Sequence, residues 1–172
     1  LIKGHQYHPA VQQLLGEMMA AVSLLTATLK FEGHIAVQLQ GDGPVNFVAV
    51  NGNHALELRG IARVRADIGE TDLRSLIGKG QLIITLTPQD GERYQGVVSA
   101  DADSLAEVIQ DYFEQSEQLS TRVWLFADGE HAAGMFLQRM PASGKDMVGF
   151  EHLATLTDTV TAQELFTLPA EQ

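Results

Sequence analysis

The chain has 172 residues, of which 45% are hydrophobic and 19% are charged, proportions typical of one soluble globular domain. Its formal net charge of -11 argues against nucleic acids and anionic membranes as partners, because both select for lysine and arginine. The absence of cysteine excludes disulfides and thiolate-bound metals, and is compatible with a cytoplasmic location.

The first predicted element is a helix from Pro9 to Leu29, since proline suits a first helical turn. Its apolar residues recur at helical spacing: Val11, Leu15, Met18, Val22, Leu25 and Leu29. Residues 18–29 carry no charge on any side, a pattern that favours a helix buried on most of its faces. A partner-binding or membrane helix is the alternative.

A period of two replaces the helical period after Gly33. Ile35, Val37 and Leu39 alternate with polar or small residues, which predicts a half-buried strand. Turn residues follow at 41–44, and residues 45–50 form the returning strand. Asn51-Gly52 between apolar runs predicts the next hairpin turn.

The third strand of this antiparallel meander alternates as well. One side is predicted to face inward, and the other carries a row of arginines; the two sets are Leu56, Leu58, Ala62 and Val64, and Arg59, Arg63 and Arg65. A solvated sheet face is the simpler interpretation of this arginine row. An anionic ligand or the acidic segment of a partner is the more specific one.

The rest of the chain predicts an α+β fold with two further hairpins and several helices. Asp90-Gly91 separates the strands 82–87 and 94–99, and Asp128-Gly129 separates 123–126 from 134–140. Residues 66–80 are predicted to form a connection with one helical turn at 73–77. An amphipathic helix that ends near Ser116 is predicted after the capping pattern of Ser104 to Glu107, and a shorter helix is predicted at 150–160. A second capping pattern, Thr161 to Glu164, opens the last segment.

Candidate catalytic and metal-binding residues are few. Asp42, Asp90 and Asp128 could form an acid cluster, but each precedes glycine in a turn, where aspartate usually bonds to its own backbone. His5 and His8 have the spacing of helix-borne ligands without a nearby third ligand. The remaining histidines are scattered: His34, His54, His131 and His152.

Gly78-Lys79-Gly80 lacks the Lys-Ser or Lys-Thr ending of a phosphate-binding loop and precedes a strand, so a turn is the simpler interpretation. The residues thus predict no catalytic, cofactor or metal site.

The order of parts over residues 24–60, a chargeless helix followed at once by strands with Gly-Asp-Gly-Pro and Asn-Gly, resembles the core domain of the 33-kDa heat-shock protein family. The resemblance spans nearly the whole chain. It is carried by Arg-Gly-Ile-Ala at 59–62, Ile-Thr-Leu-Thr-Pro at 84–88, Gly-Glu-Arg-Tyr-Gln-Gly-Val-Val at 91–98, Ser-Glu-Gln-Leu at 116–119, Ala-Ala-Gly-Met at 132–135 and His-Leu-Ala-Thr-Leu-Thr at 152–157.

The resemblance implies a bacterial, redox-regulated holdase, which binds unfolding proteins under oxidative and heat stress without ATP. It also implies a link between the active form and dimerisation. The family's zinc and disulfide cysteines lie in a C-terminal module that has no counterpart in residues 1–172, so no metal site is carried over. We therefore interpret the chain as a fragment that contains one chaperone core domain. The resemblance identifies no client-binding residue.

Two other classes of function stay open. One is an enzyme that uses an arginine of the row and a turn aspartate on a small anionic substrate, which a deep pocket with shifted titrating groups would favour. The other is a structural or assembly domain with a constitutive partner, which a large flat apolar interface would favour.

Overall fold

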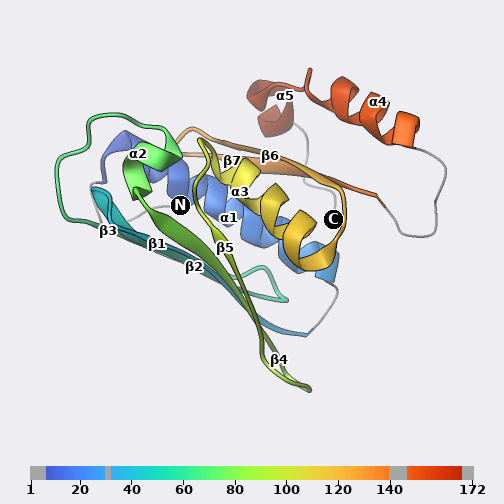
Figure 1. Cartoon of the computed structure of the whole chain (residues 1–172), viewed down its shortest axis with the longest axis horizontal. Helices are drawn as coiled ribbons and strands as arrows, with labels where there is room; N and C mark the ends of the chain where they lie inside the picture. Colours follow the sequence, from blue (N-terminus) through green and yellow to red (C-terminus); the bar gives the residue numbers. More distant parts are fainter. Residues whose placement is uncertain (1–6, 30–31, 140–146, 168–172) are drawn as a thin grey trace.

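A computed structural model describes residues 7–29, 32–139 and 147–167 of the chain (Figure 1). The helices and strands follow one another in the order α1 (Pro9–Leu29), β1 (Gly33–Gly41), β2 (Val45–Asn53), β3 (Leu58–Val64), α2 (Leu73–Ile77), β4 (Gly80–Pro88), β5 (Tyr94–Ser99), α3 (Leu105–Tyr112), the π-helical turn η1 (Phe113–Glu117), β6 (Thr121–Ala127), β7 (Ala132–Gln138), α4 (Met147–Thr157) and α5 (Ala162–Thr167).

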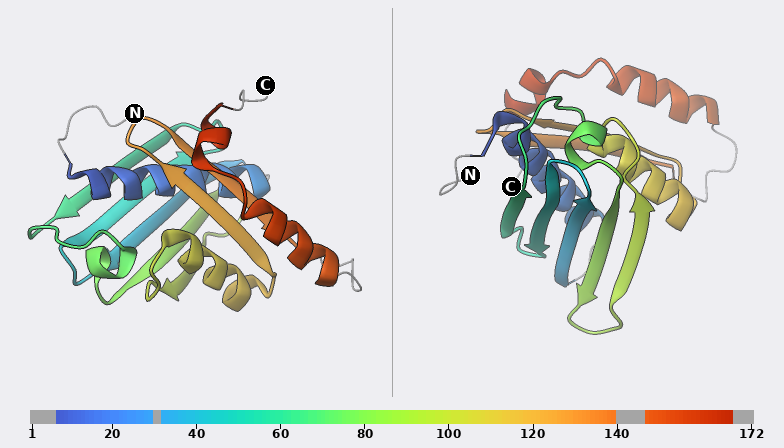
Figure 2. Two further views of the ribbon diagram at one scale, coloured as in Figure 1. Left: turned by 90° about the horizontal axis from the view of Figure 1, so that it is seen from above. Right: turned by 60° about the vertical axis from the view of Figure 1, so that its left-hand side comes forward.

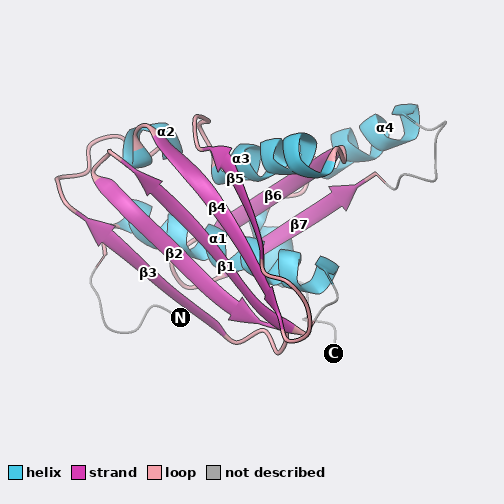
Figure 3. Cartoon of the chain, turned by 60° about the horizontal axis from the view of Figure 1, so that its bottom comes forward, coloured by secondary structure: helices cyan, strands magenta, loops and turns pink. Residues whose placement is uncertain are grey.

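The strands form two antiparallel sheets (Figure 3). The larger sheet has the order β3-β2-β1-β4-β5, so that β1 is central and β3 and β5 are the edges. The hairpin β6-β7 is the second sheet. The predicted α+β class and the meander β1-β2-β3 are therefore confirmed.

Helix α1 lies between the larger sheet and the β6-β7 hairpin (Figure 2). Val11, Met18 and Val22 have no exposed surface, and the flanking alanines are buried as well. By length and composition α1 could cross a membrane, but two thirds of that stretch is buried inside the fold. Its uncharged sides therefore serve the core, as the sequence predicted.

The larger sheet turns one face toward α1. Ile35, Val37 and Leu39 of β1 are buried on this face, as predicted. Their partners across the strands, among them Leu82 and Ile84 of β4, share that face and complete the core.

The predicted hairpin turn at Asn51-Gly52 is wrong. Both residues lie inside β2 and pair with β1 and β3, and the turn comes later, where the Asn53 side chain accepts hydrogen bonds from the backbone of Ala55 and Glu57. Glycine is needed at position 52 because a Cβ atom there would lie 2.8 Å from Val22 of α1. A close helix–strand approach, which sequence alone does not show, thus explains this glycine.

The inward orientation that was predicted for two residues of the third strand is also wrong. Leu56 lies in the β2-β3 turn with a φ of 58° and is 54% exposed. Val64 is 44% exposed, because α1 covers only part of the edge strand β3. Arg65 lies beyond the end of that strand.

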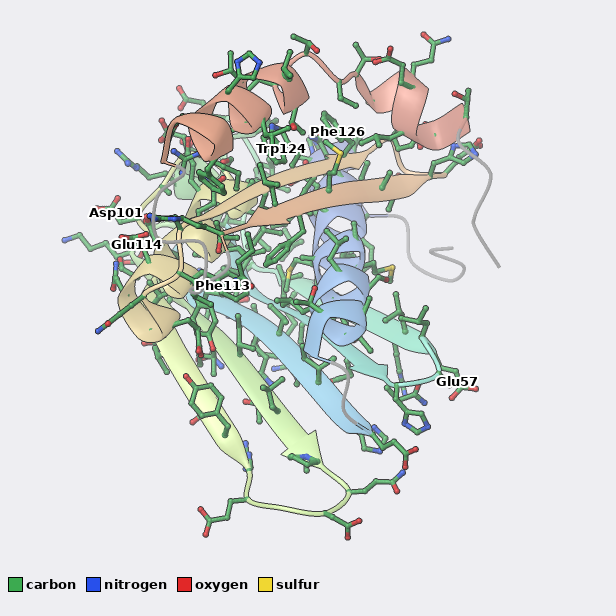
Figure 4. The ribbon with its side chains drawn as sticks, turned by 90° about the vertical axis from the view of Figure 1, so that its right-hand side faces the viewer. Glu57, Asp101, Phe113, Glu114, Trp124 and Phe126 are labelled. Carbon is green, nitrogen blue, oxygen red and sulfur yellow. The ribbon has the colours of Figure 1, made fainter. Side chains whose placement is uncertain are left out.

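The predicted helices are confirmed, α1 and α2 with the predicted ends and α3 and α4 with shifted ends. Ser104 and Glu107 form the capping box of α3, and η1 continues that helix until Gln118 adopts a left-handed φ of 53°. Helices α4 and α5 lie across the outer side of the hairpin, where the Trp124 indole donates a hydrogen bond of 2.8 Å to Asp158 (Figure 4). Of the predicted hairpin 123–140, Met140 falls outside the described residues.

Candidate functional site

The three turn aspartates do not form a site. Asp42 follows β1 and Asp90 follows β4, and these antiparallel strands place them at opposite ends of the larger sheet. Asp128 belongs to the turn of the other sheet. The possible convergent acid cluster is therefore excluded.

Asp42 stabilises the fold across a long sequence distance. Its carboxylate accepts a hydrogen bond of 2.7 Å from the backbone N–H of Lys79, not from its own turn. Gly43 donates to the carbonyl of Ile77, and a Cβ atom on Gly78 would lie 2.3 Å from the Asp42 carboxylate. The Gly-Lys-Gly segment is thus a packed connection against the β1-β2 turn, in agreement with the interpretation as a turn.

Asp128 holds its own turn, as predicted. Its carboxylate accepts hydrogen bonds from the backbone N–H groups of Glu130 and His131 at 2.9 and 2.7 Å. These two bonds lower the pKa of Asp128, because they favour the charged carboxylate. Gly129 has a φ of 93°, which a side chain rarely adopts.

We expect Gly129→Val to lower the free energy of unfolding by about 1–3 kcal/mol, because a β-branched residue is strained at positive φ. Asp128→Asn should leave both stability and any activity nearly unchanged, since the amide oxygen can accept the same backbone bonds. Urea unfolding of the two variants checks this pair. An Asn variant that stays folded and loses activity would instead give the carboxylate a chemical role.

The histidines are dispersed over separate elements. His34 lies in β1, His54 in the β2-β3 turn, His131 in the β6-β7 turn and His152 in α4, and all four are exposed. His8 accepts a hydrogen bond from the Ala10 N–H at the start of α1, and His5 falls outside the described residues. No group of three or more possible metal ligands occurs among the described residues.

The arginine row lies along the edge strand β3. The Arg63 guanidinium lies over the Phe47 ring at 5.4 Å, and Arg65 donates to the Gly43 carbonyl at 2.9 Å. Within the described part of the chain, no carboxylate forms an ion pair with these two residues or with Arg59. These exposed cations are thus not neutralised by partners within the described fold.

The face of the larger sheet that points away from α1 is called the open face here, because no described helix packs on it (Figure 1). Cross-strand register assigns to it His34, Ala36, Gln38, Gln40, Phe47, Ala49, Asn51, Asn53, Arg59, Ile61, Arg63, Gln81, Ile83, Thr85, Thr87, Gln95, Val97 and Ser99. Ile61 and Val97 are 46% and 52% exposed. Sequence reasoning missed this surface, since its glutamines resembled an ordinary solvated face.

An apolar cleft opens at the C-terminal end of α1. It has a volume of about 270 Å³ and is lined mainly by Leu25, Ile84, Leu86, Phe113 and Leu119. Phe113 points into this region beneath the hairpin (Figure 4) and packs edge-on against Phe136 at 5.2 Å. The cleft can take an apolar group.

The other shifted titrating groups lie away from the arginine row. Burial and a hydrogen bond to Tyr94 raise the pKa of Tyr112, which lines the apolar cleft. The pKa of Glu17 is raised, because the effect of burial exceeds the opposite effect of its hydrogen bond with Gln13. Glu17 lines a smaller cavity of about 140 Å³ beside α2. A third cavity, of about 220 Å³, lies between α1 and the β6-β7 turn and is lined in part by Glu130 and His131. None of the three is lined by an arginine of the row or a turn aspartate, so the geometry gives the enzyme hypothesis no support.

Comparison with known proteins shows the family to which the chain is related. The chain matches the family described as "Hsp33 protein" over residues 1–172. It is 56% identical over 173 aligned residues to the 33 kDa chaperonin of Shewanella oneidensis and 55% identical to that of Shewanella sediminis. The alignments cover 100% of this chain and 60% of each relative, so the chain spans about three fifths of their length.

The crystal structure of the 33 kDa chaperonin from Thermotoga maritima has the same fold. The two structures superpose with a TM-score of 0.76 at 19% sequence identity, over 95% of this chain and 60% of the other. The fold likeness agrees with the sequence match over the whole chain. The chain therefore belongs to the Hsp33 family.

Proposed function

We propose that residues 1–172 form the core domain of an ATP-independent holdase chaperone, which binds unfolding proteins and prevents their aggregation under oxidative and heat stress. Membership of a bacterial chaperone family supports this proposal, and a cytoplasmic location accords with it. Such a protein needs apolar surface that clients can reach and no catalytic residues.

The open face is the observation that carries the proposal. A row across its five strands contains four aliphatic residues and one uncharged polar residue, in the order Ile61, Ala49, Gln38, Ile83 and Val97. Ile61 and Val97 on the two edge strands are exposed, Ile83 is half-buried, and Ala49 is buried between larger neighbours. Apart from Arg59 and Arg63 on the edge strand β3, the strands of this face carry no Asp, Glu, Lys or Arg. Such a face can bury apolar segments of many sequences, because the hydrophobic effect has no directional requirement. We propose that clients contact this face.

Aggregation of a chemically unfolded protein, followed by light scattering without nucleotide, tests the proposal. We expect the chain to suppress scattering and Val97→Asp to weaken the suppression several-fold, since binding would then desolvate a carboxylate. Leu153→Asp is the matched control, because Leu153 is also 52% exposed but lies on α4. Equal effects of both substitutions would exclude the open face as the client surface.

Zinc has no place in this proposal for residues 1–172. The family holds zinc through cysteine thiolates, and this chain has no cysteine. The scattered histidines and turn aspartates do not replace those ligands, since the described residues contain no group of three possible ligands. The residues present therefore do not fit the family's metal.

We accordingly expect holdase activity of residues 1–172 to be independent of chelators and thiol oxidants. Suppression should be the same with and without diamide, because no thiol is present to form a disulfide. Diamide is preferable to peroxide, which could oxidise the 5 methionines. A several-fold gain on diamide treatment that dithiothreitol reverses would contradict this expectation.

We also propose a homodimer, following the family's link between activity and dimerisation. The open face, which no described helix covers, is the surface that we propose for this interface, and sedimentation of the chain over a range of concentrations tests the dimer. A sedimentation coefficient that stays monomeric at all concentrations would contradict the dimer and leave client binding as a separate question.

A further inference from the structure

The charges of the larger sheet are concentrated on one strand. Arg59 and Arg63 are the only Asp, Glu, Lys or Arg residues in its five strands, although the whole chain has a net charge of -11. Both belong to the edge strand β3, and cross-strand register places both on the open face. Exposed Ile61 lies between them on the same side.

Strand β3 also has backbone hydrogen-bonding groups that point away from β2, of which only those of Ala62 bond to a described residue. The Tyr7 hydroxyl donates to the Ala62 carbonyl at 3.2 Å and accepts from the Ala62 N–H at 3.3 Å, so the backbone of Ala62 points away from β2. Antiparallel alternation gives the same outward direction to Leu58, Gly60 and Val64. No described residue bonds to the outward groups of these three.

We propose that this edge binds an extended acidic segment of another polypeptide, which adds to the sheet as a strand beside β3. Strand addition supplies the main-chain hydrogen bonds, and the side chains of Arg59, Ile61 and Arg63 select the sequence. In the added strand the residues opposite these three form the closely spaced cross-strand pairs. The segment preferred by this edge therefore has the pattern acidic, any, apolar, any, acidic.

Charge complementarity favours an acidic occupant over others. Positive residues on an edge strand normally hinder pairing with other strands, because a like-charged or apolar strand gains nothing from them. An acidic strand instead gains two opposite-charge pairs, about 13 Å apart along β3. The chain's net negative charge repels anionic nucleic acid, whereas a short peptide meets only the local positive edge.

Two synthetic peptides of equal composition test the pattern. The first contains Glu-Thr-Val-Thr-Glu between short Ser-Thr flanks, and the second contains Thr-Glu-Val-Glu-Thr, which turns both acids to the face opposite valine. Fluorescence anisotropy of labelled peptides measures affinity for the full chain at low salt. We expect the first peptide to bind several-fold more tightly, and N-methylation of its edge-facing amides to abolish binding.

Substitutions of the two arginines test whether the peptide binds at β3. Arg59→Gln with Arg63→Gln should weaken binding of the first peptide roughly tenfold, the value of two cross-strand charge pairs. The matched control is Lys79→Gln with Arg93→Gln, which removes the same charge from exposed positions outside β3. Equal affinity of both double variants, or of both peptides, would overturn the proposal.

Substitution of Tyr7 tests strand addition through an expected gain in peptide affinity, which an edge that binds no peptide would not show. Tyr7→Phe keeps the ring and removes the hydroxyl that occupies the Ala62 backbone, so we expect tighter peptide binding. Unchanged or weaker binding with an unchanged melting temperature would count against strand addition at this edge. A dimer that the Arg59 and Arg63 double variant dissociates, without peptide binding, would assign the edge to a second copy and overturn the acidic occupant. These binding measurements are independent of aggregation suppression.

Discussion

Leu25→Asp is expected to lower the free energy of unfolding by about 4 kcal/mol or more, because it buries a carboxylate without a partner. Leu25 is 3% exposed and belongs to the core that α1 forms with the larger sheet and the hairpin. Urea unfolding followed by circular dichroism measures the change. The apolar cleft beside Leu25 offers the carboxylate partial access to water, so the loss can be smaller than at Val22.

Ala27→Asp is the matched control for this substitution. Ala27 lies on the same helix two residues later and is exposed, so the added charge stays in water. We expect a loss of less than about 1 kcal/mol, mainly from helix propensity. Similar unfolding midpoints for the two variants would show that α1 is not the central helix of the core.

Helix α1 and helix α2 were predictable because local signals alone determine them. The stripe from Val11 to Leu25 has one period throughout, and the predicted helix ends at Pro9 and Leu29 agree with the structure. Asp72 caps α2 by accepting from the Ser75 N–H, and Gly78 ends that helix with a φ of 71°. Helix propensity, capping and burial all favour the same structure in both helices, so such segments can be predicted from sequence.

The meander was predictable in its strand order but not in its turns. Asn51-Gly52 has the composition of a tight hairpin turn, yet Gly52 serves a close approach to Val22, a residue that lies thirty positions earlier. Likewise, Asp42 has the composition of a self-bonded turn, yet it binds the Lys79 backbone. In both cases a tertiary contact overrides local turn chemistry, and one sequence shows no sign of it.

The positions of the arginine edge and of the open face depend on strand pairing between segments that are far apart in the sequence. The alternation along the third strand placed Arg59 and Arg63 on one side, and that prediction is confirmed, whereas Arg65 lies beyond the strand. Their position at a free edge follows only from the pairing of β1 with β4, which leaves β3 outermost. The extent of the open face was also not predictable, since Ile61, Ile83 and Val97 share one face of the sheet only through that strand order.

Gly16→Val is expected to lower the free energy of unfolding by about 3 kcal/mol, because α1 approaches the hairpin closely at this glycine. A Cβ atom on Gly16 would lie 2.5 Å from the Cβ of Ala127 at the end of β6, a separation that real Cβ atoms do not show. The hairpin would have to move away from α1, and its packing on the core would loosen. Thermal and urea unfolding measure the loss.

Gly16→Ala decides whether the contact or the helix propensity dominates. Alanine in place of glycine inside a helix normally stabilises by about 1 kcal/mol, so a neutral or destabilising result requires the contact with Ala127. Combining Gly16→Ala with Ala127→Gly removes the clash and keeps the better helix former. We expect the double variant to be more stable than the sum of the single changes predicts, whereas additive effects would mean that the two residues do not touch.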